Sequence, residues 1–256
     1  MDKTQLGSIQ QHIQDGVCTI MFSHPAHNSL PGKLLATLAD AIETAGLTPE
    51  VKVIVLKSGG DRTFCAGASF DELMSIEDME TGKVFFSGFA NVINALRKCP
   101  KLVIGRVQGK TIGGGVGIAA ACDYCMATKF AAVKLSELAV GIGPFVVGPA
   151  VERKIGVSAM SQLAINATEL KSAEWAKEKG LFTEVFDDAD ALDAAVETLC
   201  QKLVSSNPEA MRLLKKIFWQ GTEHWDKLLA ERAAVSGELV LSDFTKNAIA
   251  KFKQKA

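Results

Sequence analysis

A glycine cluster directly follows a predicted strand near the middle of the chain. Residues 110–123 read KTIGGGVGIAAACD, so four of the five positions from 113 to 117 are glycine. Glycine inside a helix costs about 1 kcal/mol relative to alanine. Its use here therefore indicates a place where a ligand or another segment comes so close that a side chain would block it.

The arrangement of a strand followed by a glycine-rich turn occurs twice. The nearly continuous apolar run VKVIVLKS at 51–58 predicts a strand that is buried on both faces, and GGDRTFCAGAS follows it at 59–69. KLVIGRVQG at 101–109 predicts a second strand, for which the glycine cluster is the turn. Helical periodicity resumes over 71–98. Repeated units of strands and a helix predict the α/β class, with a spiral or doubly wound core.

The N-terminal part of the chain predicts a hairpin and a helix. Residues 8–22 are typical of two strands around a turn at Asp15 and Gly16. Ser29 is a suitable N-cap for a helix that has apolar residues at four-residue spacing and ends near Gly46. Both elements precede the first buried strand.

Beyond about residue 158 the sequence predicts helices. Asn207 and Pro208 are typical of an N-cap and a first helical position. No low-complexity linker interrupts this part, so we expect one fold unit, with a core over 1–195 and a C-terminal helical module over 196–256. Apolar residues of this part exceed the needs of a monomer's core and favour self-association: Trp219, Trp225, Leu228 and Leu229.

Composition excludes several classes of function. The formal net charge is -1, which argues against broad binding to nucleic acids or membrane surfaces. No apolar run reaches the roughly 18 residues that a membrane span needs. The polar N-terminus lacks the apolar stretch of a signal peptide. We therefore expect a cytoplasmic protein without nucleic-acid or membrane partners.

The six cysteines are scattered in apolar surroundings, which predicts reduced, buried thiols. Cys122 and Cys125 form a lone C-x-x-C, which can be half of a zinc site or a redox pair. No second pair follows, and the four histidines are distant in the sequence. We expect no metal.

Two mechanisms could explain the glycine cluster. The first is a dinucleotide site, because Gly115, Gly117 and Ala120 match the G-x-G-x-x-[GA] fingerprint after a strand. Glu137 lies twenty residues beyond Gly117, where that fingerprint has an acid. The fingerprint usually opens its domain, however, and here about 110 residues precede it.

The second mechanism is an oxyanion hole. Two backbone N–H groups aimed at one point stabilise negative charge that develops on a carbonyl oxygen. The N-terminus of a helix that begins at the cluster would contribute further positive potential. This mechanism needs donors from two places in the chain, and the two glycine-rich turns at 64–69 and 112–117 provide them.

Over nearly its whole length the chain resembles the crotonase superfamily, the enoyl-CoA hydratase/isomerase family. The matching pieces, in order, are HNSL (27–30), FCAGAS (64–69), GGGVGIAAACD (113–123), LSELAVGI (135–142) and the helical tail. The resemblance implies a spiral of ββα turns with a C-terminal helical trimerisation module. It also implies homotrimers or dimers of trimers, and a coenzyme A thioester as the substrate.

The resemblance assigns roles to the two glycine-rich turns. It places the oxyanion donors on the backbone N–H groups of Ala66 and Gly114. The stretch Ala66, Gly67, Ala68 and Ser69 would line the bent arm of coenzyme A. The usual Asp at the end of this stretch is Ser69 here, a departure that affects contacts with coenzyme A more than the chemistry.

Hydratases of the family use two glutamates, of which this chain has one. Glu137 matches the second, whereas Gly117 stands at the position of the first. Addition of water requires an activated water and a proton, and two carboxylates can share these tasks. Moving a double bond requires one base. Pro144 and Phe145 resemble the apolar wall of single-glutamate isomerases, and desolvation there should raise the pKa of Glu137.

The helix after the AGA turn lines the acyl pocket in the family. The resemblance therefore implies that Met74, Phe85 and Phe89 lie in that pocket together with Phe145, although the Met and Phe set could equally be plain core. No cofactor is implied beyond the coenzyme A of the substrate.

The function expected from these residues is acid/base chemistry by Glu137 on an enoyl-CoA, through an oxyanion-stabilised enolate, with isomerisation favoured. The alternative is hydration of a short or branched 2-enoyl-CoA, as in the breakdown of fatty acids or branched amino acids. An alternative of another class is a weakly catalytic relative that binds CoA thioesters.

Overall fold

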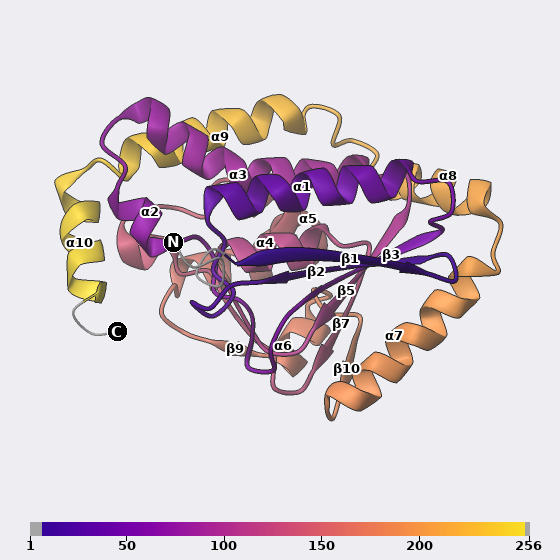
Figure 1. The fold of residues 1–256 in the computed structure, drawn as a ribbon. Helices are drawn as coiled ribbons and strands as arrows, with labels where there is room; N and C mark the ends of the chain where they lie inside the picture. The colour runs from indigo at the N-terminus through magenta and orange to yellow at the C-terminus, as the bar shows by residue number, and fades with distance from the viewer. Residues whose placement is uncertain (1–6, 254–256) are drawn as a thin grey trace.

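Two β-sheets form the frame of the structure, a computed structural model that describes residues 7–253 (Figure 1). The larger sheet has the strand order β1 (Ser8–Gln14), β2 (Val17–Ser23), β3 (Val53–Ser58), β5 (Leu102–Val107), β7 (Tyr124–Thr128) and β10 (Glu184–Phe186). The smaller sheet has the order β4 (Thr63–Cys65), β6 (Lys110–Ile112), β8 (Ala132–Lys134) and β9 (Lys171–Ser172). Neighbouring strands are parallel except at β1–β2 and β8–β9.

The chain winds as a spiral of ββα units. Each unit that starts at β3, β5 or β7 gives its first strand to the larger sheet and its second strand to the smaller sheet. A helix follows each pair: α3 (Met79–Lys98), α4 (Gly114–Ala121) and α5 (Gly148–Ile165). The predicted repeat is confirmed. Because β4 and β6 are parallel neighbours, the turns that follow them lie at the same edge of the sheet.

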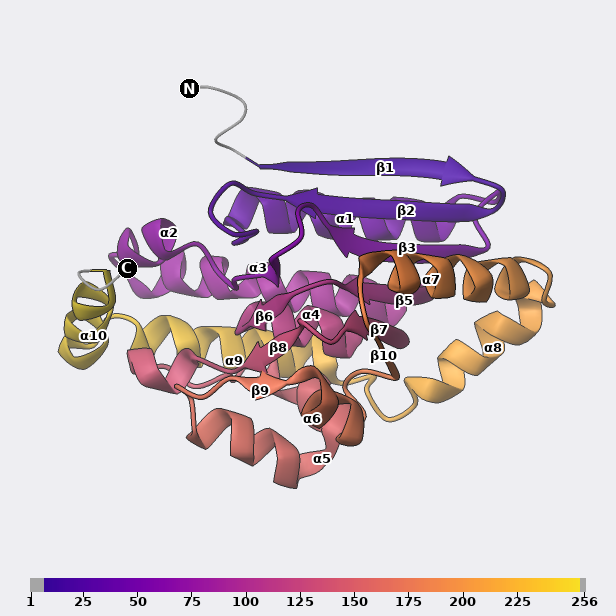
Figure 2. The same ribbon diagram turned by 90° about the horizontal axis from the view of Figure 1, so that it is seen from below.

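Helices cover both faces of the larger sheet (Figures 1 and 2). On one face α1 (Gly32–Leu47), α3 and α9 (Trp225–Leu239) lie side by side. On the other face α7 (Ala189–Val204) packs Leu192 and Val196 against Val55 and Ile104. This alternation gives the continuous apolar strands a buried environment on both sides. Every helix among the described residues is too short or too polar to span a bilayer.

The first helix begins two residues later than the sequence indicates. The β1–β2 hairpin turns at Asp15 and Gly16, as predicted. However, α1 starts at Gly32 with Pro31 as its N-cap, so the predicted cap at Ser29 is wrong. Proline disfavours helical geometry in the preceding residue. Leu30 instead donates its N–H to the carbonyl of Gly67 over 2.8 Å, which ties this loop to the first glycine-rich turn.

The helix predicted over 71–98 is two helices. A short α2 (Phe70–Met74) ends before α3, which starts after the N-cap Asp78. Asp78 and Thr81 form a reciprocal capping box, which satisfies the N–H groups at the start of α3. Because this capping box holds Asp78 in an extended conformation, the helix is interrupted between α2 and α3.

Two glycines allow α3 and α9 to cross closely. A Cβ added to Gly82 would lie 2.8 Å from the Cα of Gly237, and one added to Gly237 would lie 2.7 Å from the backbone N of Lys83. Both distances are shorter than real Cβ contacts. The crossing brings Ser236 of α9 to the inner side of α3, where it lines a cavity described below.

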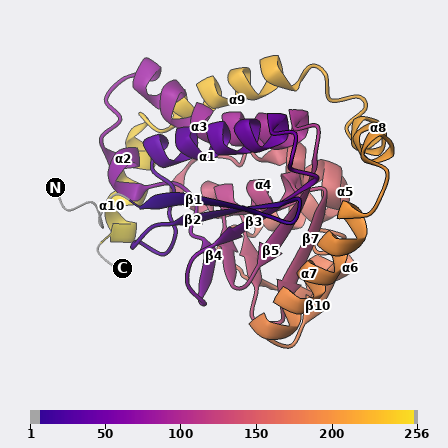
Figure 3. The same ribbon diagram turned by 45° about the vertical axis from the view of Figure 1, so that its right-hand side comes forward.

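The C-terminal helices α6 (Ala173–Glu178), α8 (Pro208–Phe218), α9 and α10 (Asp243–Lys253) wrap around the spiral (Figure 3). Asn207 caps α8 as predicted. The boundary expected between the core and the helical module, after residue 195, falls inside α7. The first and last residues of these two expected parts, 1–6 and 254–256, lie outside the described residues.

A buried ion pair joins α8 to the spiral. Nζ of Lys215 lies 2.9 Å from Oδ2 of Asp123, and the two side chains are only 3% and 4% exposed. Asp123 follows α4 closely and also accepts hydrogen bonds from Trp219 Nε1 and the Val103 N–H. The helical module is thus anchored on one carboxylate.

The residues expected to drive self-association lie mostly in the chain's own core. Trp219, Trp225 and Leu229 are buried, and Leu228 packs partly against the same core. The two tryptophan rings pack edge to face, with centroids 5.8 Å apart. Four exposed apolar side chains of this part lie together on α8: Leu213, Leu214, Ile217 and Phe218.

Candidate active site

A largely apolar cavity of about 90 Å³ lies where the two glycine-rich turns meet α2, α3 and α9. Its wall has three side chains with polar atoms: Ser136, Glu137 and Ser236. The remaining wall comes from Ala66, Gly67, Ala68, Phe70, Leu73, Phe86, Phe89, Gly113, Gly114, Val140, Ile142, Gly143, Pro144, Phe145, Val146 and Val147.

The two turns are in contact at this cavity. Ala66 directly follows β4, and Gly114 is the first residue of α4, whose N–H has no acceptor within its own helix. A Cβ added to Gly67 would lie 3.6 Å from the N of Gly114. The structure therefore brings together two backbone segments that are about 50 residues apart in the sequence.

Close packing explains the glycines of the second turn. Gly113 has a φ of 53°, which disfavours any side chain, and it positions the first turn of α4. A Cβ on Gly114 would lie 2.1 Å from the ring of Phe89, and one on Gly115 would lie 2.7 Å from the Cβ of Cys65. Close contact with other segments of the protein itself therefore explains part of the glycine cluster.

Glu137 is the only carboxylate in the cavity wall among the described residues. It begins a 3-10 helix, Glu137–Val140, and its Oε2 is shielded from solvent without a hydrogen-bond partner in the described part of the chain. The residue as a whole is only half-buried, because its other atoms retain exposure. Burial of the carboxyl raises its pKa from 4.5 to about 7. A hydrogen bond from the residue's own backbone N–H lowers the pKa by less than burial raises it.

The C-terminal helix supports the turn that carries Glu137. Oγ1 of Thr245 in α10 donates to the carbonyl of Gly141 over 3.1 Å. Ile249 of α10 joins Val140 and Ile142 in a small apolar cluster that is separate from the main core. In Figure 1 α10 lies beside α2, at the end of the molecule away from α8.

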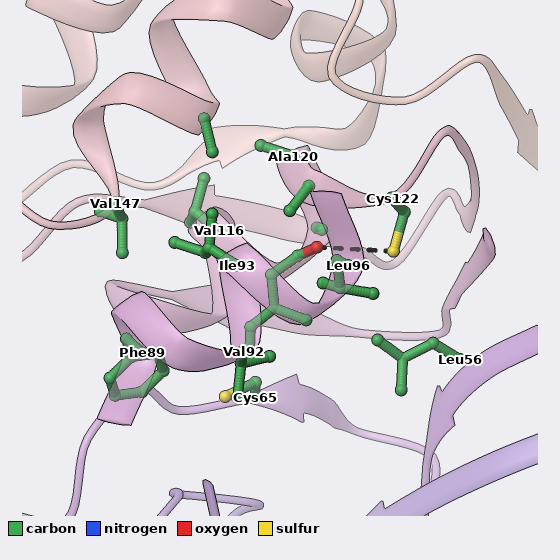
Figure 4. Close-up of a cluster of buried hydrophobic side chains, with 14 of the residues drawn as sticks. Leu56, Cys65, Phe89, Val92, Ile93, Leu96, Val116, Ala120, Cys122 and Val147 are labelled. Atoms are coloured by element: carbon green, nitrogen blue, oxygen red, sulfur yellow. Dashed lines mark hydrogen bonds between the residues drawn. The ribbon is translucent and has the colours of Figure 1, made fainter. Parts of the chain in front are cut away.

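Gly117 lies behind the cavity wall, and a side chain there meets Val147. A Cβ on Gly117 would be 2.6 Å from the Cβ of Val147 and 3.4 Å from Ile93. Figure 4 shows Val147, Ile93 and Val116 within one apolar cluster. Apolar side chains therefore fill the space into which a second carboxylate would project.

The structure places most, but not all, of the residues singled out from the sequence at this cavity. Ala66, Gly67, Ala68, Gly114, Glu137, Phe89 and Phe145 line it. Ser69 instead caps α2, where its Oγ accepts from the Glu72 N–H over 3.4 Å.

Met74 and Phe85 do not line the cavity. Met74 ends α2 and is exposed, because the helix stops there instead of continuing along the cavity. Phe85 packs into the cluster of Leu73 and Ile249, with its ring against Phe86. The structure therefore does not bring these two side chains to this cavity, and their place in the acyl pocket stays a prediction.

Several wall residues were not singled out from the sequence. Phe86 belongs to the same apolar run as Phe89, and its three-residue spacing from Phe89 would place both on one helix face. Ser236 had no such signal, because it reaches the cavity only through the crossing of α3 and α9.

The dinucleotide interpretation of the glycine cluster fails on geometry. The fingerprint residues Gly115, Gly117 and Ala120 are all buried within α4, packed against the core, and cannot approach a pyrophosphate. Within residues 7–253 no three His, Cys, Asp or Glu side chains gather as a metal site. All six cysteines are buried free thiols.

Comparison with known proteins decides the family. The family model described as Enoyl-CoA hydratase/isomerase matches residues 12–255. The chain belongs to the enoyl-CoA hydratase/isomerase family. The relatives that it matches are named as hydratases and as an isomerase of CoA thioesters.

Three relatives illustrate the range of the family. The chain is 32% identical over 200 residues to mouse methylglutaconyl-CoA hydratase, a match that covers 77% of the chain but 63% of that protein. It is 28% identical to the short-chain-enoyl-CoA hydratase of Clostridium acetobutylicum, over 98% of the chain and 96% of the relative. It is 27% identical to a peroxisomal dienoyl-CoA isomerase of Arabidopsis thaliana, over 84% of the chain and 81% of that isomerase.

Solved structures confirm the crotonase-type fold. An enoyl-CoA hydratase from Bacillus halodurans superposes with a TM-score of 0.88 at 20% identity, and the match covers 95% of this chain and 99% of the other. An enoyl-CoA hydratase from Mycobacterium avium subsp. paratuberculosis superposes with a TM-score of 0.83 at 26% identity. This match covers 94% of this chain and 97% of the other. The spiral of ββα units is therefore the shared architecture.

Proposed function

We propose that this family member acts on an enoyl-CoA thioester, with Glu137 as the single acid/base and isomerisation favoured over hydration. The observation that carries the proposal is the buried Glu137 carboxyl, whose pKa is raised to about 7, in a largely apolar cavity. Among the described residues of its wall, the other side chains with polar atoms are those of two serines. A general base is most effective when its pKa is close to the working pH.

The two backbone segments at the cavity suit the thioester. In the proposed complex its carbonyl oxygen accepts hydrogen bonds from the N–H groups of Ala66 and Gly114, with the coenzyme A arm along residues 66–69. Donors fixed before the reaction stabilise the charge of an enolate without reorganisation. The absence of a side chain at Gly114 also leaves room for the Phe89 ring, which lines the same cavity. No cofactor is required.

Proton transfer by one carboxylate completes the isomerisation. Glu137 takes a proton from C2 of a 3-enoyl thioester, and the electrons pass into the enolate and the adjacent double bond. The protonated Glu137 then returns the proton to C4, which leaves a conjugated 2-enoyl thioester and the carboxylate. The step needs no water, in keeping with the apolar wall formed by Phe145 and Val147.

Hydration of a 2-enoyl-CoA is the second candidate. It is favoured by the full-length similarity to the short-chain-enoyl-CoA hydratase. Against it stands Val147, which fills the space next to Gly117. A weakly catalytic thioester-binding role is a third candidate, and the retained, buried Glu137 argues against it.

A substrate panel tests these candidates. We expect the enzyme to convert short 3-enoyl-CoA faster than it hydrates 2-enoyl-CoA of the same length. Formation of the conjugated thioester raises the ultraviolet absorbance and hydration lowers it, so one assay separates the two. Fast hydration without measurable isomerisation would reverse the order of the first two candidates, and no turnover with tight thioester binding would favour the third.

We also propose a homotrimer or a dimer of trimers. The support is the exposed apolar face of α8, which contains Leu214, Ile217 and Phe218, whereas Lys215 of the same helix is buried. Exposed apolar faces of this kind mark interfaces. We expect light scattering at micromolar concentration to give three or six times the 27.3 kDa chain mass. A monomeric mass would contradict the assembly.

A further inference from the structure

One hydroxyl in the cavity wall lacks a hydrogen-bond partner in the described part of the chain. The hydroxyl of Ser236 is occupied, because it donates to the carbonyl of Arg232 over 3.1 Å. Ser136 makes no side-chain hydrogen bond within residues 7–253, although it lines the cavity directly before Glu137. A hydroxyl at such a place is available to a ligand or to water.

Ser136 and Glu137 flank the same space. The point where a Cβ of Gly113 would lie is 3.2 Å from Oε1 of Glu137 and 3.7 Å from Oγ of Ser136. Both oxygen atoms therefore lie next to Gly113, on the side where any other residue would carry its side chain. A water molecule in the cavity beside Gly113 has a carboxylate and a hydroxyl as its neighbours.

We propose that Ser136 is a further catalytic residue, whose hydroxyl holds the attacking water beside Glu137 and so determines how much hydration accompanies isomerisation. The inference rests on the proposed function of the cavity. It assigns to a serine the water-holding task for which a second carboxylate is missing at Gly117.

The hydration step balances with these groups alone. Water held by Ser136 and Glu137 forms a bond from its oxygen to C3 of the 2-enoyl thioester, while Glu137 accepts one water proton. The C2–C3 π electrons move into the thioester enolate. Glu137 then delivers its proton to C2, which gives the 3-hydroxyacyl thioester and restores the carboxylate. Ser136 gains and loses no proton.

A hydroxyl holds water less firmly than a carboxylate does, because hydrogen bonds to ionised acceptors are roughly twice as strong. Ser136 therefore supports hydration at a reduced rate, whereas isomerisation does not use the water at all. The two reactions of one site should for this reason respond differently to loss of the hydroxyl.

The test compares both reactions in three variants of the full chain. We expect Ser136→Ala to lower the hydration kcat about tenfold, corresponding to one lost hydrogen bond, and to leave isomerisation within about threefold. Ser136→Thr keeps a hydroxyl and should restore most of the hydration. Ser236→Ala, which removes the other serine hydroxyl of the wall, is the matched control and should leave the ratio of the two rates unchanged.

Three results would overturn the proposal: a wild type without hydration, an unchanged ratio of hydration to isomerisation in Ser136→Ala, which includes an equal loss of both reactions, or the same change of this ratio in Ser236→Ala. Failure of the proposed function is distinguishable, because it would appear as a Glu137→Gln variant that retains both reactions.

Discussion

Glu137→Gln should lower the isomerisation kcat at least about 100-fold, the lower end of what a general acid/base contributes. Glutamine has the size of glutamate and can donate and accept hydrogen bonds, but it cannot take a proton from C2. The thioester should still bind, because the N–H groups of Ala66 and Gly114 are unchanged. We therefore expect a small change in the dissociation constant of a substrate analogue, measured by calorimetry, beside a large loss of turnover.

The pH dependence should follow the same carboxyl. Wild-type isomerisation requires the ionised form, so its rate should fall as the pH decreases through about 7, the raised pKa of Glu137. The residual activity of Glu137→Gln should lack this step. A wild-type rate that is flat between pH 6 and 8 would contradict the assignment of the base.

Stability provides a second readout of Glu137. The folded chain keeps this proton up to about pH 7, whereas the unfolded chain releases it near 4.5. The folded state consequently loses relative stability as the pH rises through that window. Glu137→Gln does not ionise, so its Tm should exceed that of the wild type at pH 8, and the difference should shrink towards pH 5. A lower Tm of the variant at pH 8 would show that the carboxylate has a structural role.

Lys215→Met should reduce the free energy of unfolding by about 3–5 kcal/mol, the usual effect of removing one partner of a buried ion pair. The variant leaves the Asp123 carboxylate buried without its cation, although Trp219 and Val103 still donate to it. Denaturant unfolding, followed by circular dichroism, measures the loss. Lys216→Met is the matched control, because Lys216 is the neighbouring, exposed lysine of the same helix.

The double variant Lys215→Met/Asp123→Asn separates the charge from the packing. Removing the unpaired carboxylate should recover part of the stability, since most of the single-variant loss is the burial of an uncompensated charge. If Lys215→Met and Lys216→Met cost equally little, the pair does not anchor α8.

The parts of the fold that the sequence predicted are those set by local pattern. The strands at 51–58 and 101–109 are long apolar runs, and their repetition with glycine-rich turns indicated the spiral. The start of α1 was missed because a long-range hydrogen bond from Leu30 to Gly67 competes with the local cap at Ser29. The break before Asp78 was missed because its capping box lies within an otherwise continuous apolar periodicity.

The sequence predicted those parts of the site that a backbone motif defines. It did not predict the residues that reach the site through the packing of distant helices. Ala66, Gly114 and Glu137 were assigned by resemblance, and the structure gathers them at one cavity. Ser236 depends on two glycines that let distant helices cross, a relation that no local pattern contains. Met74 lies outside the cavity wall because α2 ends at this residue, which the helical period does not reveal.

The support of the Glu137 turn by α10 sets an order of events during protein synthesis. The contacts of Thr245 and Ile249 come from the last helix in the described chain, whereas both sheets are complete by residue 186. A nascent chain on the ribosome can thus pair its strands while the turn that carries Glu137 still lacks its contacts with α10. That turn gains this support only after α10 has left the exit tunnel, later than both sheets.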